Sequence, residues 1–259
     1  MWELLRNAAR HRYVLQNFVA RDLRVKYRGS FLGYLWSLLE PLSLVGIYYF
    51  VFVLIARRGG PDYPLVVALG ILPYTFFSSV ITGGAGALTS NRSLIRRVFV
   101  PRELFVLGHV GSQLAVFAFS LLAVVPLLFV YGQVPGWRLI LLPLSILLLT
   151  LLATGVALGL ACANVLYRDV TYVLRVLLRV VFYASPVIYP LSLVPERLQV
   201  WYLLNPLATL LTMLRSACTN APFEVPLHFA GLALAVSVGA FTAGAAVFTR
   251  WQSRAVKYL

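Results

Sequence analysis

Long stretches without charge restrict the fold of this chain more than any other feature of its sequence. Five stretches qualify: residues 29–56, in which Glu40 is the one charged residue, and residues 63–91, 104–137, 139–167 and 225–249, which contain none. Each is longer than the roughly 20 helical residues that cross a bilayer. The chain is 61% hydrophobic and 12% charged, far from the balance of a soluble domain. The sequence therefore predicts an all-α, multi-pass membrane protein.

The placement of the basic residues predicts how the chain is inserted. The net charge is +14, and residues 1–32, 89–103, 165–179 and 250–259 hold 17 of the 22 Lys and Arg residues. Cytoplasmic loops are enriched in Lys and Arg, so both termini are expected in the cytoplasm and the protein in the cytoplasmic (inner) membrane. Topology then accounts for the positive charge, which gives no reason to expect nucleic-acid binding.

The first 30 residues are expected to lie on the membrane and connect to the first span. Within residues 2–18, at about 100° per residue, Glu3, Arg6 and Arg10 fall on one stripe, while Leu5 and Phe18 belong to the apolar remainder. A helix of this kind lies in the headgroup plane with its apolar side in lipid. We therefore predict a cytoplasmic amphipathic helix over residues 2–18.

Residues 172–222 decide the number of spans. Residues 172–190 read as a span that is broken at its outer end by Pro186 and Pro190. Residues 191–222 are long enough to cross again, but a crossing would move the basic C-terminus outside, and Asn205-Pro206 divides them. We expect a re-entrant pair of short helices on the outer side, against protein or a water-filled cavity. The predicted single domain has six transmembrane helices, at residues 31–56, 64–88, 104–131, 139–164, 172–190 and 226–250.

Groups that could perform catalysis are scarce. The chain has eight acidic residues and three histidines. Asp22, Glu103 and Asp169 stand beside basic residues in the predicted cytoplasmic segments, so solvated ion pairs are expected, and His109 in an apolar helix is expected to be structural. No GxxxxGK[ST] phosphate loop occurs, and no Cys or His spacing is typical of a metal site. The sequence predicts a transport subunit without catalytic residues, metal or cofactor of its own.

Four segments together resemble one known family. They are RDLRVKYRGSFLGYLWSLLEPL at residues 21–42, NRSLIRRVFVPREL at 91–104, YRDV at 167–170 followed by SPVIYP at 185–190, and LLNPLATLLTMLRSA at 203–217. In their order and topological positions, they are similar to the membrane (permease) subunit of type-2 ABC exporters that move polysaccharides, including O-antigen, teichoic acid, capsule and galactan. The resemblance runs nearly from end to end.

The resemblance implies a homodimer of this chain with two copies of a separate ABC ATPase, which would bind ATP and Mg. It implies export of a lipid-linked polysaccharide, commonly carried on undecaprenyl pyrophosphate. The ATPase would dock on a short helix that Ser90 could cap and that must end before Pro101. The coupling residues would be Arg92, Leu94, Ile95, Arg96 and Arg97. The outer gate would comprise Tyr189, Asn205, Pro206 and Arg215.

Two further sets of residues are candidates for contact with the cargo. The basic cluster Arg24, Lys26 and Arg28 could receive the lipid pyrophosphate at the inner leaflet. Sugars present C–H faces and hydroxyl groups, which suit aromatic rings beside a few polar groups. Residues within arcs of roughly 120° on the first and fifth spans are therefore predicted to line a channel: Tyr34, Ser37, Glu40, Tyr48, Phe52, Tyr172, Phe182 and Tyr183. The same rings could instead be interface anchors or packing residues.

Two other functions stay open at this stage. The chain could be a type-2 ABC permease for another cargo, such as a drug or a lipid. It could also be an intramembrane enzyme acting on polyprenyl-linked sugars, although that activity needs an acid pair or a metal cluster, which the sequence does not display.

Overall fold

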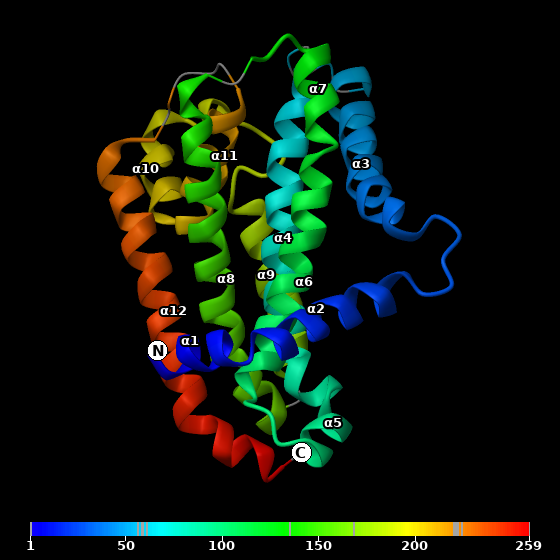
Figure 1. Cartoon of the computed structure of the whole chain (residues 1–259). Helices are drawn as coiled ribbons and strands as arrows, with labels where there is room; N and C mark the ends of the chain where they lie inside the picture. Colours follow the sequence, from blue (N-terminus) through cyan, green and yellow to red (C-terminus); the bar gives the residue numbers. More distant parts are fainter. Residues whose placement is uncertain are drawn as a thin grey trace.

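The computed structural model describes residues 2–55, 57, 60, 62–134, 136–167, 169–219, 223 and 225–258, without the side chains of residues 2, 3, 5, 34 and 256. These described residues form helices and no strand, as predicted. Figure 1 shows an upright bundle with two short helices lying across it. The C-terminus and α5 (Arg92–Arg97) lie at one end, called here the α5 end, and α10 (Glu196–Leu204) lies at the opposite end, the α10 end.

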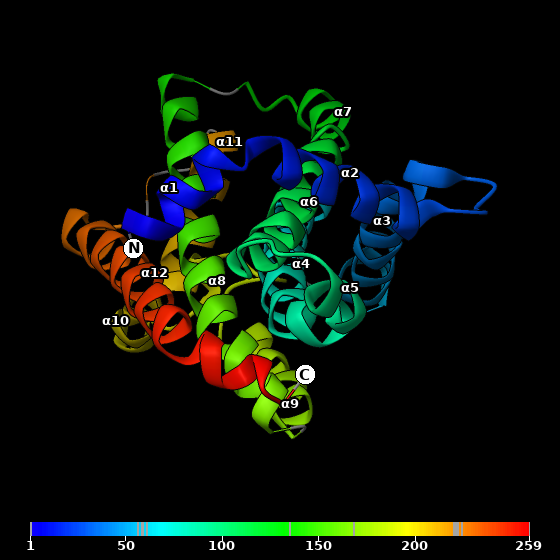
Figure 2. The same cartoon turned by 60° about the horizontal axis from the view of Figure 1, so that its bottom comes forward.

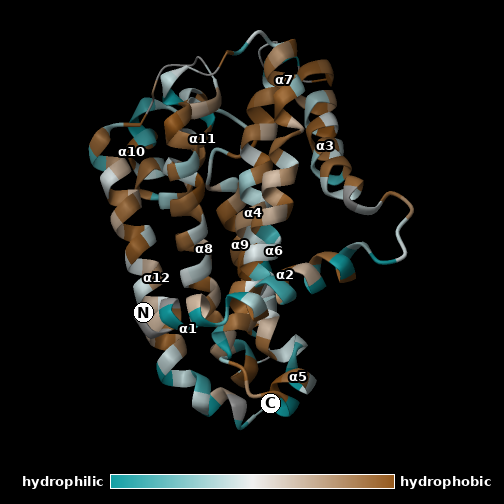
Figure 3. Cartoon of the chain, in the orientation of Figure 1, coloured by the Kyte–Doolittle hydropathy of each residue, from teal (hydrophilic) through white to brown (hydrophobic). Residues whose placement is uncertain are grey.

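Five helical segments in the described part of the chain are long and apolar enough to cross a membrane. Figure 3 shows their mainly hydrophobic composition and the polar residues at α1 (Trp2–Arg10), α2 (Arg12–Tyr27), α5 and the end of α12 (Leu227–Val256). The spans are α3 (Trp36–Tyr49) with the π-helical η2 (Phe50–Ile55), α4 (Tyr63–Ser90), α6 (Glu103–Leu121) with α7 (Val124–Val130), η3 (Trp137–Ile140) with α8 (Leu141–Leu166), and α12 (Leu227–Val256). They match five of the six predicted spans, with ends that shift by a few residues.

The remaining predicted span, residues 172–190, is only partly helical. α9 (Val170–Tyr183) has 14 residues, which is about 21 Å of helix, whereas a hydrocarbon core is about 30 Å thick. Pro186 has no N–H to continue the helix, and the chain turns through residues 184–189 toward η4 (Leu191–Leu193). α9 is therefore too short by itself to count among the five candidate spans.

Residues 191–222 contain two short helices, α10 and α11 (Pro206–Cys218). They meet at Asn205-Pro206, which confirms the predicted break. Pro206 occupies the first position of α11, where its missing N–H is tolerated. The Asn205 side chain caps the helix by accepting a hydrogen bond from the Leu207 N–H at 3.1 Å. Every residue of α11 from Leu207 to Cys218 is buried, so this helix is enclosed by the rest of the chain.

In the bundle, α8 packs against both α4 and α12. A Cβ atom on Gly155 of α8 would lie 2.4 Å from the backbone of Ala240, and one on Gly244 of α12 would lie 1.9 Å from the Gly155 carbonyl oxygen. These glycines let the two backbones touch, as small residues do between membrane helices. In the most apolar part of α4, 67% of the residues are buried, against 11% for α3 with η2. α3 therefore lies at the periphery (the rim) of the helix bundle.

The predicted amphipathic helix is two helices, α1 (Trp2–Arg10) and α2 (Arg12–Tyr27). They lie across the bundle in both Figure 1 and Figure 2. Phe18 of α2 stacks on Phe105 of α6, with ring centroids 4.8 Å apart. Gly108 permits this approach, because a Cβ there would lie 2.8 Å from the Phe18 Cβ. The helix pair is thus packed on the bundle in an orientation suited to a membrane surface.

Two local predictions near α5 need correction. The residue that precedes α5 is Asn91 rather than Ser90, and its side chain donates to the Ala87 carbonyl oxygen at 2.8 Å. Glu103, predicted to be solvated, is 5% exposed and accepts a hydrogen bond from Asn7 Nδ2 at 2.7 Å. The prediction for Glu103 was wrong because α1 covers the beginning of α6, a contact between residues 96 positions apart.

Candidate functional site

The α10 end is organised around Arg215, one of the residues predicted for an outer gate. Its side chain is 6% exposed, and its guanidinium donates to the carbonyl oxygens of Val66 (3.1 Å), Pro186 (3.0 Å) and Tyr189 (3.3 Å). Gly70 leaves room for this arrangement, because a Cβ atom there would overlap the backbone beside Pro186. Buried polar groups need such partners, so Arg215 anchors residues 186–189 to α4.

The other predicted gate residues fasten the same turn. The Tyr189 hydroxyl donates to the Tyr183 carbonyl oxygen at 3.0 Å and lies 3.0 Å from the Tyr202 hydroxyl. Asn205 Nδ2 donates to Ser185 Oγ at 2.9 Å, while its side-chain oxygen caps α11. The fold therefore brings Tyr189, Asn205, Pro206 and Arg215 together around the turn that follows α9.

A cavity of about 1330 Å³ opens beside this network. It is larger than the roughly 300–1,000 Å³ of typical small-molecule sites. Its aromatic lining consists of Phe52, Tyr63, Tyr189 and Tyr202, and its polar lining includes Asp62, Gln133, Ser192, Thr212, Arg215, Ser216 and Thr219. Rings that combine an apolar face with a hydroxyl group, placed beside polar side chains, suit the C–H faces and hydroxyl groups of sugars.

Sequence reasoning selected Phe52, Tyr189 and Arg215 but missed most of the residues that line this cavity. Asp62 precedes α4, Gln133 follows α7, and Tyr202 lies in α10, so no shared periodicity connects them. The available signal was the position of Tyr202 shortly before the Asn205-Pro206 break. Only the folded arrangement of the separate connections identifies the set.

Four of the predicted channel residues form aromatic contacts near this level. The rings of Tyr48 and Phe52 have centroids 6.3 Å apart, and those of Phe182 and Tyr183 are 5.1 Å apart in an edge-on geometry. The first pair lies on the predicted first-span face and the second on the predicted fifth-span face. Tyr183 is 61% exposed, and Phe182 also meets Tyr74 edge-on.

The other predicted channel residues lie apart from these rings. Ser37 is buried, and its carbonyl oxygen accepts a hydrogen bond from Ser120 Oγ of α6 at 3.1 Å. Glu40 is exposed and lines, together with Lys26, a small cavity of about 40 Å³. Tyr172 lies toward the α5 end and is exposed. The side chain of Tyr34 lies outside the described residues.

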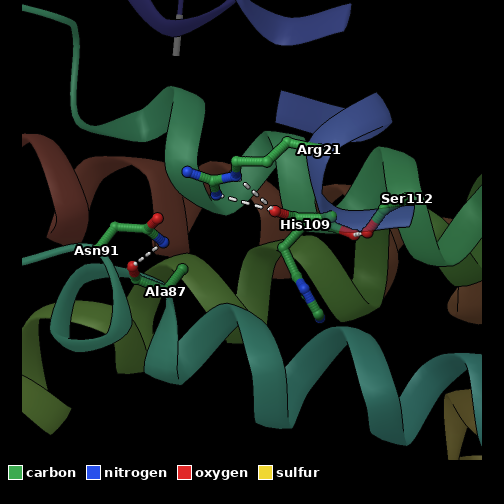
Figure 4. Close-up of polar contacts among 6 residues, drawn as sticks. Arg21, Ala87, Asn91, His109 and Ser112 are labelled. Carbon is green, nitrogen blue, oxygen red and sulfur yellow. Dashed lines mark hydrogen bonds and ion pairs between the residues drawn. The ribbon is translucent and has the colours of Figure 1, made fainter. Parts of the chain in front are cut away.

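One of the three predicted phosphate-binding residues lines a groove between α2, α4 and α6. This groove has a volume of about 570 Å³ and contains Lys26, Arg21, Asn91, His109 and Ser112. Figure 4 shows the last four residues around it. All three basic residues, Arg24, Lys26 and Arg28, are exposed. Of the three, only Lys26 lines this groove.

Two groups in this groove behave as the sequence predicted. Arg21 forms an ion pair with Asp22, with a nitrogen–oxygen distance of 2.8 Å. His109 Nε2 lies 3.1 Å from the Ser79 carbonyl oxygen of α4, and Gly83 leaves space for the imidazole ring. His109 thus joins α6 to α4 and is a structural histidine.

The predicted coupling helix lies at the opposite end from the large cavity. Arg92, Arg96 and Arg97 are exposed, whereas Leu94 and Ile95 are half-buried and pack against the core. The sequence analysis did not select Phe99, which follows the helix and is fully exposed. Leu94 and Ile95 therefore attach α5 to the bundle, while its arginines and the nearby Phe99 ring face outward.

Apolar spans, two helices that lie across them and the enclosed helix α11 define this chain as a multi-pass membrane protein with a large, mainly apolar cavity at one end and a basic surface at the other. It belongs to the ABC-2 type transporter family, whose model matches residues 13–218. It is similar to the O-antigen export system permease protein RfbA of Myxococcus xanthus, with 34% identity over 82% of each chain. It is also similar to the protein of the same name from Klebsiella pneumoniae, with 30% identity over 83% of this chain and 85% of that one. The polysialic acid transport protein KpsM of Escherichia coli is 26% identical over 76% of this chain and 78% of its own.

Proposed function

We propose that this chain is the permease subunit of an ATP-driven exporter that moves a lipid-linked polysaccharide across the cytoplasmic membrane. The observation that carries the proposal is similarity to O-antigen export permeases over more than four-fifths of both chains. The sequence has no phosphate loop, so a separate ABC ATPase would supply the energy. The chain itself would form the path and catalyse no bond change.

Two copies of the chain would enclose the path in this proposal. In one chain, apolar side chains of the rim helices are exposed: Ile47 of α3 by 56%, Leu177 of α9 by 54% and Tyr183 of α9 by 61%. A second copy of the chain would cover part of this surface, and membrane lipid would cover the rest. Rings such as Tyr183 would then offer a passing glycan a flat apolar face without a tightly fitting pocket.

Six crossings, with both termini in the cytoplasm, fit the charge distribution best. α9 would enter the membrane from the cytoplasmic side, and the turn at residues 184–190, together with α10 and α11, would complete the outer half. Irregular backbone at membrane depth must be shielded by protein, and Arg215 supplies donors to that turn. The α5 end is then cytoplasmic, and α5 would dock on the ATPase.

Single cysteines test this topology. At position 92 or 254 a cysteine should react with a membrane-impermeant thiol reagent only from the cytoplasm, and at position 62 or 197 only from outside. The native Cys162 and Cys218 are buried and provide the background. Labelling of position 254 from outside would contradict the six-span topology and would show that α10 and α11 together cross the membrane.

Reconstitution tests the function itself. Proteoliposomes containing the permease and its partner ATPase should move a lipid-linked polysaccharide in an ATP-dependent way, and vesicles with ATPase alone are the control. ATP-driven movement of a drug or a phospholipid without any movement of the glycan would identify another cargo. Chemical change of a polyprenyl-linked sugar by the permease alone would identify an enzyme.

A further inference from the structure

A separate polar cavity lies at the α5 end, where several segments distant in the sequence meet. Its volume is about 460 Å³, and its lining includes Thr89 of α4, Arg92 of α5, Asn164 of α8, Arg175 of α9 and Tyr258 near the C-terminus. Figure 2, which brings this end forward, shows the C-terminus beside α9. The sequence analysis gave no reason to place these five residues together.

Two positively charged side chains line the cavity, and the described part of its lining contains no acidic side chain to neutralise them. Arg92 and Arg175 are permanently protonated, and no Asp or Glu is among the described residues that line the cavity. A bound anion would offset the charge of these two guanidinium groups. Guanidinium groups bind oxyanions through paired N–H donors. The charge of this cavity therefore favours an anionic ligand.

The walls of the cavity are held in place before any ligand binds. Asn164 is 9% exposed; its Nδ2 donates to the Ala85 carbonyl oxygen of α4 at 3.2 Å, and its Oδ1 accepts from Thr171 Oγ1 of α9 at 2.7 Å. One side chain thus ties three helices together. The Arg175 guanidinium lies 5.3 Å from the centre of the Tyr172 ring, a cation–π contact that restricts its orientation.

The level of the cavity indicates where its ligand comes from. Thr89 is the last residue but one of α4, which ends at Ser90, and Asn164 lies two residues before the end of α8 at Leu166. Both helices are candidate spans, so we expect the cavity, at the ends of both helices, to lie at the edge of the hydrocarbon core. Phosphate groups of lipids occupy that level of a bilayer.

From the charge, the fixed walls and this level, we infer that the cavity is a binding site for a phosphate or diphosphate group on a lipid. The group has two possible sources with the same chemistry: the headgroup of an anionic phospholipid, or the diphosphate of a lipid-linked cargo. The second source rests on the proposed function, and the first does not. Bound there, the group bridges Arg92 of the coupling helix and Arg175 of α9, and so links the ATPase-facing surface to the channel-facing helix.

Anion binding to the full-length permease tests the site directly. The protein in nanodiscs of phosphatidylcholine should bind inorganic pyrophosphate, measured by calorimetry and by the rise in melting temperature. Arg92→Gln and Arg175→Gln should each weaken that binding about tenfold or more, since a charged hydrogen bond is lost. Arg175→Lys keeps the positive charge but lacks the planar guanidinium with its paired N–H donors. Its affinity for pyrophosphate should therefore lie between those of the wild type and Arg175→Gln. Arg102→Gln, at the same end but outside the cavity, is the matched control.

A second arm separates the two sources. Replacing a third of the phosphatidylcholine with phosphatidylglycerol should block pyrophosphate binding if phospholipid headgroups occupy the cavity, and should leave it intact if only a diphosphate does. Either result supports the site, provided that the Arg92 and Arg175 variants abolish the effect. Equal pyrophosphate binding by wild type, Arg92→Gln and Arg175→Gln would overturn it.

Two further measurements distinguish this inference from a role of the two arginines in ATPase docking and from the proposed export function. If the glutamine variants bind pyrophosphate normally and lose only association with the ATPase, the counter-charge belongs to the partner protein and the inference is wrong. Export is measured in the same variants. Unchanged pyrophosphate binding with intact export removes the anion site and leaves the proposed function standing. Anion binding by a chain that exports no glycan removes the proposed function and leaves the site.

Discussion

Arginine serves different purposes at the two ends of this molecule. At the α10 end, Arg215 is buried and donates to the carbonyl oxygens of Val66, Pro186 and Tyr189. At the α5 end, Arg92 and Arg175 are exposed beside a cavity without a described acid. A guanidinium held by fixed backbone acceptors stabilises a structure, whereas an exposed one can donate to another molecule. Burial and the supply of acceptors, rather than residue type, therefore separate anchoring arginines from interacting ones.

Replacement of Arg215 should have the largest effect on stability. Arg215→Gln removes donors from several buried carbonyl groups, and each unsatisfied acceptor costs about 1–3 kcal/mol, so we expect a loss of roughly 3 kcal/mol or more. The amount of protein in the membrane and its melting temperature in detergent measure this. Arg197→Gln, on the exposed surface of α10, is the control. Normal amounts of an Arg215→Gln protein that fails only in export would assign Arg215 to a gate instead.

Replacement of Asn205 should have a smaller effect at the same end. Asn205→Ala removes the cap of α11 and the hydrogen bond to Ser185, and loss of an N-cap typically costs about 1 kcal/mol. Asn205→Asp keeps the capping oxygen and removes the amide donor, so its melting temperature should lie between those of Asn205→Ala and the wild type. Equal melting temperatures for Asn205→Ala and the wild type would contradict the anchoring network.

Replacement of the exposed Tyr183 should affect transport more than folding. Tyr183→Ala removes a ring that is 61% exposed, and exposed positions contribute little to stability, so export should fall more than protein level does. Tyr183→Phe keeps the ring and should restore most of the export if the ring stacks on sugars. The same pair of changes at Tyr48 tests the facing helix. Loss of protein in both variants would identify packing residues.

Charge reversal on α5 should have the smallest effect on the fold. The double variant Arg96→Glu and Arg97→Glu changes two exposed side chains, so membrane insertion and melting temperature should stay as in the wild type. Association with the ATPase, or transport-linked ATP hydrolysis, should weaken because the docking surface changes sign. Wild-type export and hydrolysis in this variant would remove the coupling role and leave the α5 end without a demonstrated partner.

The elements that could be predicted from sequence depend on signals local in the chain. Uncharged runs predicted five spans because the bilayer sets a minimum length for an apolar helix. The split between α10 and α11 followed from Asn205-Pro206, since proline acts on the turn in which it stands. The resemblance of four separate segments also predicted the family to which the chain belongs.

The features that escaped prediction depend on contacts between distant residues. Glu103 is buried because α1 crosses the start of α6, and no pattern around Glu103 records that contact. Lys26 lines the groove between α2, α4 and α6 and Arg24 does not, a difference that the spacing of the basic residues does not predict.

The bond between Arg215 and Val66 also has a consequence for the order in which the protein is assembled. The two residues are 149 positions apart, and at about 5–20 residues per second a ribosome needs roughly 7–30 seconds to make the intervening chain. During that time α4 resides in the membrane without α11, the helix whose Arg215 will bind its α10 end. The α10 end is therefore completed late in synthesis, and a chain that stalls before Arg215 has no means of fastening the turn at residues 186–189.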